Sequence, residues 1–121
     1  MEGLYYYTDE AQKHMQLLRF YFDGLVLGAG LEGTVNDIPE ILKWFNREQF
    51  LKSPHRNYGQ FKMSKSQYIH FDLESSFGKI VYTGELNESG HISLISHSHI
   101  NGYTTQVIYS PVPKEFMTIT E

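Results

Sequence analysis

From residue 57 to residue 110 the chain alternates apolar and polar residues in five strand-like runs separated by short turns. A period of two is typical of strands that bury one face. The turns at 65–67, 75–78 and 88–90 have lengths that keep the apolar residues in phase from one run to the next. The pairs that these turns predict are Phe61–Phe71, Glu74–Lys79 and Leu86–Ile92. The pattern therefore predicts an antiparallel meander with one apolar face.

The last turn of this meander is Asn101-Gly102. Both central residues of a type I′ hairpin turn need a positive φ, and Asn-Gly is a strongly preferred pair there. A two-residue turn at this point predicts that Ser98 lies opposite Thr105, with both side chains on the inward face.

The first half of the chain predicts three shorter strands, at residues 4–8, 16–22 and 25–29. A two-residue turn at Asp23-Gly24 joins the last two and places Phe20, Phe22 and Leu25 on one face. The opposite face is also largely apolar, so another element should cover it.

The covering element is a helix predicted over residues 37–50. Its apolar residues recur at i, i+3, i+4 and i+7, at Ile38, Ile41, Leu42 and Phe45. Asp37 and Glu40 form a capping-box-like pair, and Pro39 suits the first turn. We expect this helix to pack over the second and third strands.

Eight strands and one short helix predict an all-β fold, an antiparallel up-and-down meander that closes into a barrel or half-barrel. Closure is favoured because it removes exposed strand edges. The 121 residues are expected to form one domain, 1–121, with a helical insert at about 37–50 and a tail at 114–121.

Three runs carry a resemblance to a known family: RFYFDGLV at 19–26, VYTGEL at 81–86 and ISL at 92–94. They resemble the repeated strand-turn-strand phrases of small bacterial lipocalin-like (calycin) domains, over about residues 16–28 and 57–110. The Gly-x-Trp signature that usually opens a lipocalin is absent, and the single Trp lies in the predicted helix. The resemblance implies a β-barrel of about eight strands.

Composition narrows the function classes. A net charge of −4 argues against a broad phosphate-binding surface, so we expect no nucleic-acid partner. The absence of cysteine removes disulfides, thiolate metal sites and a Cys nucleophile.

No apolar run approaches the roughly 20 residues of a membrane span, and the acidic, aromatic start is unlike a signal peptide. We expect a cytoplasmic protein, with an extracytoplasmic location as the alternative if a signal peptide was removed.

Two motifs suggest chemistry, and neither supports an enzyme. The string GAGLEG at 28–33 matches a dinucleotide fingerprint, but the predicted helix begins too late and the later connections are antiparallel. We interpret these glycines as a pliant loop between strand and helix.

His97 and His99 share the outer face of one strand, and a metal site would need a third ligand. The candidates for it are His70, Glu85 and His91. We expect no metal, no cofactor and no catalytic set.

The inward face predicts a ligand cavity. Hydroxyls interrupt it close to tyrosines, and an unpaired buried hydroxyl costs about 1–3 kcal/mol. The predicted lining is Phe20, Phe22, Phe71, Tyr82, Ser96, Ser98, Tyr103 and Thr105. The alternative is that these hydroxyls bond one another across strands or face water at the barrel mouth. Arg19 could anchor a carboxylate, although a surface or ion-pair role fits it equally well.

The leading hypothesis is a non-enzymatic binding module for a small, largely apolar ligand. The alternative is a protein-interaction module, an inhibitor or immunity-type partner, or a homodimer. It would use the aromatic N-terminus (Tyr5, Tyr6, Tyr7) and the tail with Phe116 and Met117, because tyrosine anchors are typical of interfaces.

Overall fold

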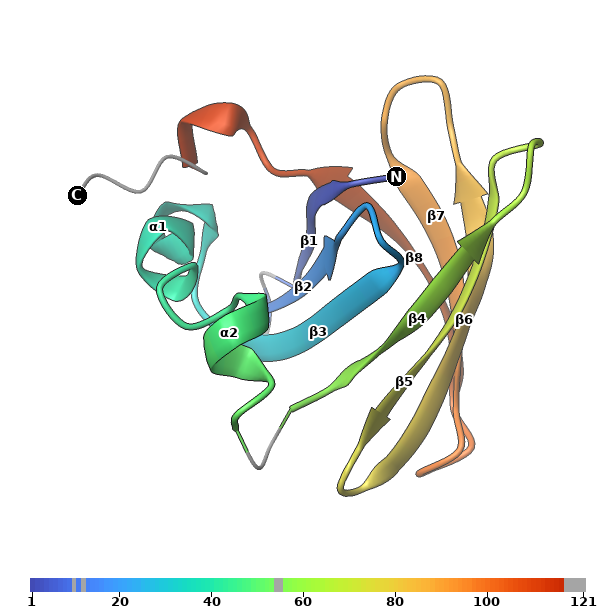
Figure 1. Ribbon diagram of the computed structural model, residues 1–121, viewed down its shortest axis with the longest axis horizontal. Coiled ribbons are helices and arrows are strands. Elements are labelled where there is room, and N and C mark those ends of the chain that lie inside the picture. Colours follow the sequence, from blue (N-terminus) through green and yellow to red (C-terminus); the bar gives the residue numbers. More distant parts are fainter. Residues whose placement is uncertain (10, 12, 54–55, 117–121) are drawn as a thin grey trace.

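The computed structural model describes residues 1–9, 11, 13–53 and 56–116, and its strands form one closed antiparallel barrel in the order β1 to β8 (Figure 1). The strands are β1 (Gly3–Asp9), β2 (His14–Phe20), β3 (Leu25–Glu32), β4 (Tyr58–Met63), β5 (Tyr68–Ser75), β6 (Gly78–Leu86), β7 (Ile92–Ser98) and β8 (Thr104–Pro111). The predicted all-β barrel is therefore confirmed. Each strand pairs with its neighbour in the chain, and β8 returns to β1.

The meander from β4 to β7 has the predicted register. Phe61 lies opposite Phe71, Glu74 opposite Lys79, and Leu86 opposite Ile92. The β6–β7 turn ends on Gly90, whose φ of +86° suits the glycine position of a three-residue hairpin turn. Local turn chemistry was sufficient to set the pairing of these four strands.

The β7–β8 turn differs from the prediction. Ser96, not Ser98, lies opposite Thr105, which is a shift of two residues along the ladder. Of the two turn residues, only Gly102 has a positive φ (+77°), so the turn is not type I′. Instead the Ser98 hydroxyl accepts hydrogen bonds from the loop amides of residues 100 and 101, at 3.1 and 3.4 Å, and supports a longer loop. A shift of two leaves every side chain on its predicted face.

The β2–β3 turn also differs, and here the consequence is larger. Tyr21 N donates to Leu25 O at 2.8 Å, and Phe20 pairs with Val26, so the loop contains three residues and not two. A shift of one residue exchanges the two faces of a strand. Leu25 therefore lies outside the barrel. The inward placement predicted for Phe22 is wrong, because that side chain lies in the loop and is 81% exposed.

The buried side chains form two clusters, one inside the barrel and one between its outer face and the helical segment. The inner cluster includes Phe20, Phe71, Tyr82 and Tyr109. The outer cluster joins Leu17, Leu25 and Leu27 of β2 and β3 to Ile38, Ile41, Leu42, Phe45 and Phe50. Figure 1 shows the helices beside β1–β3, on the side away from β5–β7. The one-residue shift in the β2–β3 turn supplies the outer cluster with its leucines.

The predicted helix over 37–50 is not continuous. It consists of a 3-10 turn (Val35–Asp37), α1 (Ile38–Ile41) and α2 (Arg47–Phe50). The break falls at Asn46, which has extended backbone angles and caps α2 by accepting a hydrogen bond from Gln49 N at 3.0 Å. None of the helices formed by the described residues has the length and apolar character that crossing a membrane requires.

The capping box lies one turn earlier than predicted. Asp37 pairs with Thr34 rather than with Glu40: the Asp37 carboxylate accepts from Thr34 N at 2.8 Å. The side chain of Thr34 accepts from Asn36 N at 3.3 Å. The 3-10 turn is thereby held before α1 begins.

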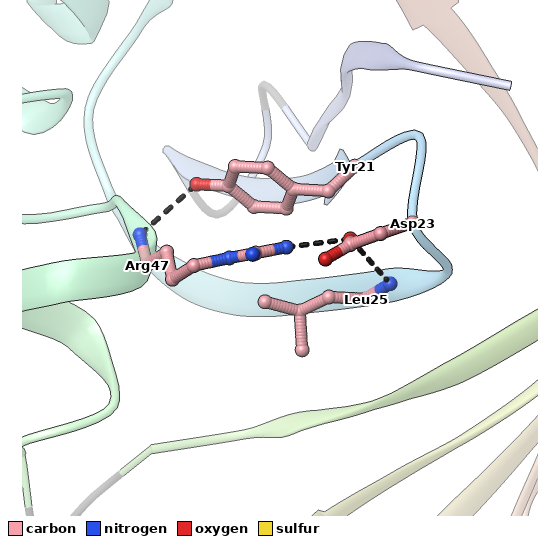
Figure 2. Close-up of polar contacts among 4 residues, drawn as sticks. All are labelled: Tyr21, Asp23, Leu25 and Arg47. Atoms are coloured by element: carbon pink, nitrogen blue, oxygen red, sulfur yellow. Dashed lines mark hydrogen bonds and ion pairs between the residues drawn. The ribbon is translucent and has the colours of Figure 1, made fainter.

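A polar clamp holds α2 against the β2–β3 turn (Figure 2). The guanidinium of Arg47 forms an ion pair with Asp23, with Nη2 and Oδ1 2.5 Å apart, and lies over the ring of Tyr21, 4.7 Å from its centroid. Arg47 N also donates to the Tyr21 hydroxyl at 3.0 Å. These contacts join α2 to the β2–β3 turn at the surface, beside the outer cluster that buries Leu25.

Candidate functional site

A cavity of about 320 Å³ lies on the inward face of the barrel, at the end where the β7–β8 loop turns. It is lined by Gln16, Ile80, Tyr82, Leu94, Ser96, Ser98, Asn101, Tyr103, Thr105, Val107 and Tyr109. None of these lining side chains carries a charge at neutral pH. The cavity thus combines aliphatic walls with hydroxyl, phenol and amide groups.

Five of the eight residues predicted to bind a ligand line this cavity: Tyr82, Ser96, Ser98, Tyr103 and Thr105. Four of them come together because inward positions on β6, β7 and β8 are neighbours across the sheet, and Tyr103 immediately precedes β8. Tyr103 is 72% exposed and stands at the rim.

The other three predicted residues lie elsewhere. Phe20 and Phe71 fill the barrel interior beside the cavity, with ring centroids 5.4 Å apart in an edge-to-face arrangement. Phe71 stacks on Tyr82, with centroids 4.7 Å apart and planes at 9°, and so forms the floor behind that ring. Phe22 takes no part, because the β2–β3 loop carries it to the surface. Aromatic packing fills one part of the barrel and leaves the other part open.

The hydroxyls of the cavity are partly satisfied within the chain, as the alternative interpretation predicted. Ser96 Oγ and Thr105 Oγ1 are 2.8 Å apart and share a hydrogen bond across the β7–β8 ladder. Ser98 Oγ accepts the two loop amides described above. These contacts fix the hydroxyl oxygens on the cavity wall.

The predicted lining omitted six of the residues that surround the cavity, and two of them, Gln16 and Tyr109, contact each other. The Tyr109 hydroxyl donates to Gln16 Oε1 at 3.1 Å across the barrel. The sequence did contain a signal for Gln16. It is a polar residue two positions before Leu18, on the strand face that lies inside the barrel and is otherwise apolar. Its partner could not be found, because the contact depends on barrel closure between strands at opposite ends of the meander.

Burial changes the acid–base properties of both phenols. It raises the pKa of Tyr82 to about 12. Burial also raises the pKa of Tyr109 far above its ordinary value, with smaller contributions from Tyr82 and Tyr7. Desolvation disfavours a phenolate, so both side chains are neutral hydrogen-bond donors at physiological pH.

Arg19 does not reach the cavity. Its side chain lies on the outer face, where Nη1 donates to Phe45 O at 2.7 Å and the guanidinium lies 5.2 Å from the centroid of the Tyr21 ring. The guanidinium therefore ties the helical segment to β2, and a role as an internal carboxylate anchor is excluded by its position.

His97 and His99 lie on the outer face, as predicted, with ring centroids 5.2 Å apart. His97 Nδ1 is 2.8 Å from Thr104 Oγ1, and His91 Nδ1 is 2.9 Å from Ser89 Oγ. Within the described ranges of the chain, no group of three or more His, Cys, Asp or Glu side chains lies close enough to hold a metal ion.

The glycine-rich string at 28–33 is not a loop, contrary to the sequence interpretation. All but its last residue belong to β3, and no helix begins at its third glycine. A Cβ at Gly28 would lie 2.5 Å from Leu73 Cδ1, so any larger residue there would require the Leu73 side chain to shift. The geometry of a dinucleotide site is therefore absent from this segment.

The aromatic N-terminus is less exposed than the interaction hypothesis assumed. Tyr5 is buried inside the barrel, edge-on to Phe20 at 5.6 Å, and Tyr7 lies 6.3 Å from the Tyr109 ring. Tyr6 packs against the outer cluster, as does Phe116 of the short turn Lys114–Phe116. Met117, also predicted as an anchor, lies outside the described residues. These tyrosines and Phe116 therefore pack against the two buried clusters, and only Tyr5 of them is buried.

Comparisons of this chain with protein-family models, with curated proteins and with solved structures found no match. The functional interpretation therefore rests on the barrel and on the chemistry of its cavity.

Proposed function

We propose that this protein is a non-enzymatic binding module that holds a small ligand with a largely apolar body in the barrel cavity. The observation that carries the proposal is the cavity of about 320 Å³ with convergent phenol, hydroxyl and amide groups. Small-molecule sites are typically about 300–1,000 Å³, mostly apolar, with a few placed polar groups. Eight-stranded barrels either fill with side chains or hold one small ligand.

The character of the lining favours binding over catalysis. Its polar side chains are serine, threonine, tyrosine, glutamine and asparagine, and none is an acid or base that titrates near neutral pH. A relationship to lipocalin-like domains is part of the same proposal. It is supported by the antiparallel eight-stranded barrel together with the sequence resemblance.

The test is a ligand screen on the protein as purified. Native mass spectrometry would detect a retained small molecule, and thermal unfolding would be followed with a panel of fatty acids, aromatic acids and neutral aromatic compounds. A true ligand at 100 times its Kd should stabilise the fold by about 2.7 kcal/mol.

A matched pair of variants locates the site. Ser96→Leu fills the cavity from β7, whereas Ser93→Leu adds the same side chain on the other face of that strand. The proposal expects Ser96→Leu to abolish the thermal shift and Ser93→Leu to retain it. Equal shifts in the two variants, or no shift with any compound of the panel, would contradict it.

A further inference from the structure

Several hydrogen-bond acceptors of the cavity are already used by the chain itself. Ser96 and Thr105 share one hydrogen bond, and the Ser98 oxygen accepts two loop amides. Gln16 Oε1 accepts the hydroxyl of Tyr109. These acceptors are less available to a ligand than groups that have no partner within the chain.

The cavity wall carries several donors without a hydrogen-bond partner among the described residues, and they include the hydroxyl of Tyr82 and the Nε2 amide of Gln16. Both side chains line the cavity, and neither atom is sealed from solvent. Gln16 is hydrogen-bonded to Tyr109, which lines the same cavity as Tyr82. Tyr82 is only 6% exposed, so its hydroxyl has little access to water, and an acceptor on a ligand would complete its hydrogen bonding.

Both donors are held in place. Stacking on Phe71 orients the ring of Tyr82, and the bond from Tyr109 fixes which end of the Gln16 amide is free. Burial raises the pKa of Tyr82 to about 12, so its proton is present at physiological pH. Groups that are oriented before binding lose little freedom when a ligand arrives.

We propose that the ligand is uncharged and presents a carbonyl-type oxygen to Tyr82 and Gln16, with its apolar body against Ile80, Leu94 and Val107. This inference rests on the proposed function. An anionic carboxylate is disfavoured, because no cationic side chain lines the cavity and Arg19 lies outside the barrel. A ligand without an acceptor would leave both donors unpaired.

The experiment compares three probes of similar size by calorimetric titration: acetophenone, its hydrocarbon analogue α-methylstyrene, and benzoate. Acetophenone should bind about tenfold or more tightly than either of the others, because a site built around donors rejects analogues that lack the acceptor. The side-chain amide signals of Gln16 should shift in a ¹⁵N NMR spectrum when acetophenone is added.

Tyr82→Phe removes only the hydroxyl and keeps the ring that stacks on Phe71. It should weaken acetophenone binding about tenfold and leave α-methylstyrene binding within about twofold. The control is Tyr5→Phe, which removes a buried phenol of the same barrel that does not line the cavity. It should leave the binding of both probes unchanged.

The outcomes separate the two proposals. If acetophenone, α-methylstyrene and benzoate bind with equal affinity, the cavity is a site without acceptor preference, and the inference fails while the proposed function stands. The inference also fails if Tyr82→Phe and Tyr5→Phe behave alike. If none of the three probes binds and the wider screen also finds no ligand, both proposals are overturned.

Discussion

Tyr109 in β8 donates a hydrogen bond to Gln16 in β2, with 3.1 Å between the hydroxyl oxygen and Oε1, although 93 residues separate them in the chain. The bond crosses the barrel interior and connects its last strand to its second. It exists only when the barrel is closed, so it reports on closure directly.

Tyr109→Phe should lower the free energy of unfolding by about 1–2 kcal/mol, because it leaves the Gln16 oxygen without its donor in a half-buried site. Urea unfolding followed by fluorescence measures the change. The control is Tyr103→Phe, which removes an exposed phenol and should change stability by less than about 0.5 kcal/mol. Equal effects of the two changes would contradict the hydrogen bond.

Alkaline pH should destabilise the fold through the two buried phenols. Burial raises the pKa of Tyr82 to about 12 and raises that of Tyr109 further, so both stay protonated in the folded state at pH values where the unfolded chain ionises. Their stabilising effect is therefore complete below pH about 10 and is lost as the pH rises above it, at about 1.4 kcal/mol per pH unit for each phenol.

The measurement is urea unfolding between pH 9 and about pH 11.5, repeated with the double variant Tyr82→Phe, Tyr109→Phe. The variant should show a clearly shallower decline, since the phenols no longer titrate. A decline as steep as that of the parent protein would assign the pH dependence to other groups.

The Arg47–Asp23 ion pair should make stability sensitive to acid. Arg47, chiefly through its side-chain hydrogen bond, lowers the pKa of Asp23 in the folded state. The contribution of the pair is therefore present above the ordinary aspartate pKa of about 4 and is lost as the pH falls through the lower folded value. The Asp23→Asn variant should thus be less stable than the parent protein at pH about 7, and the difference should shrink in strong acid. Thermal unfolding at low salt measures both stabilities. A stability gap that does not change with pH would contradict a role for the charge.

Gly84 should tolerate no side chain. A Cβ there would lie 1.8 Å from Ser93 O, in the backbone of the neighbouring strand, which cannot move without breaking the β6–β7 ladder. Gly84→Ala should cost about 3 kcal/mol or more by overpacking. Gly102→Ala is the control: its φ of +77° is strained for alanine, but nothing lies within 4 Å, so a loss of about 1–2 kcal/mol is expected. Urea unfolding should rank the two in this order, and the reverse order would contradict the close approach.

Phe20 and Phe22 provide a direct test of the β2–β3 register. Phe20→Ala removes a ring from the centre of the inner cluster and should cost about 3–5 kcal/mol. Phe22→Ala removes an exposed side chain and should change stability by less than about 0.5 kcal/mol. The two-residue turn predicted from the sequence would require similar losses for both.

The sequence alone was sufficient for the fold class and for the register of β4 to β7. Alternation of apolar and polar residues identified the strands, and the turns at 65–67, 75–78 and 88–90 determined which residues lie opposite one another. These are local properties: a short turn of given length leaves few ways to pair its flanking strands.

Only the tertiary structure decided the two remaining turns and the cavity. Asp23-Gly24 and Asn101-Gly102 both carry strong two-residue turn signals, yet each sits in a longer loop. In the first case a one-residue shift places Leu25 and Leu27 under the helical segment, which lies in the next part of the chain. The burial gained there outweighs a local turn preference.

The predicted cavity residues on β6, β7 and β8 were found because a two-residue shift preserves the faces of a strand, so the error in the last turn did not move Ser96, Ser98 or Thr105 away from the interior. The contact between Gln16 and Tyr109 was missed because it joins strands from opposite ends of the chain. Alternation along a strand determines which side chains face inward, whereas barrel closure determines which inward side chains meet and where space remains between them.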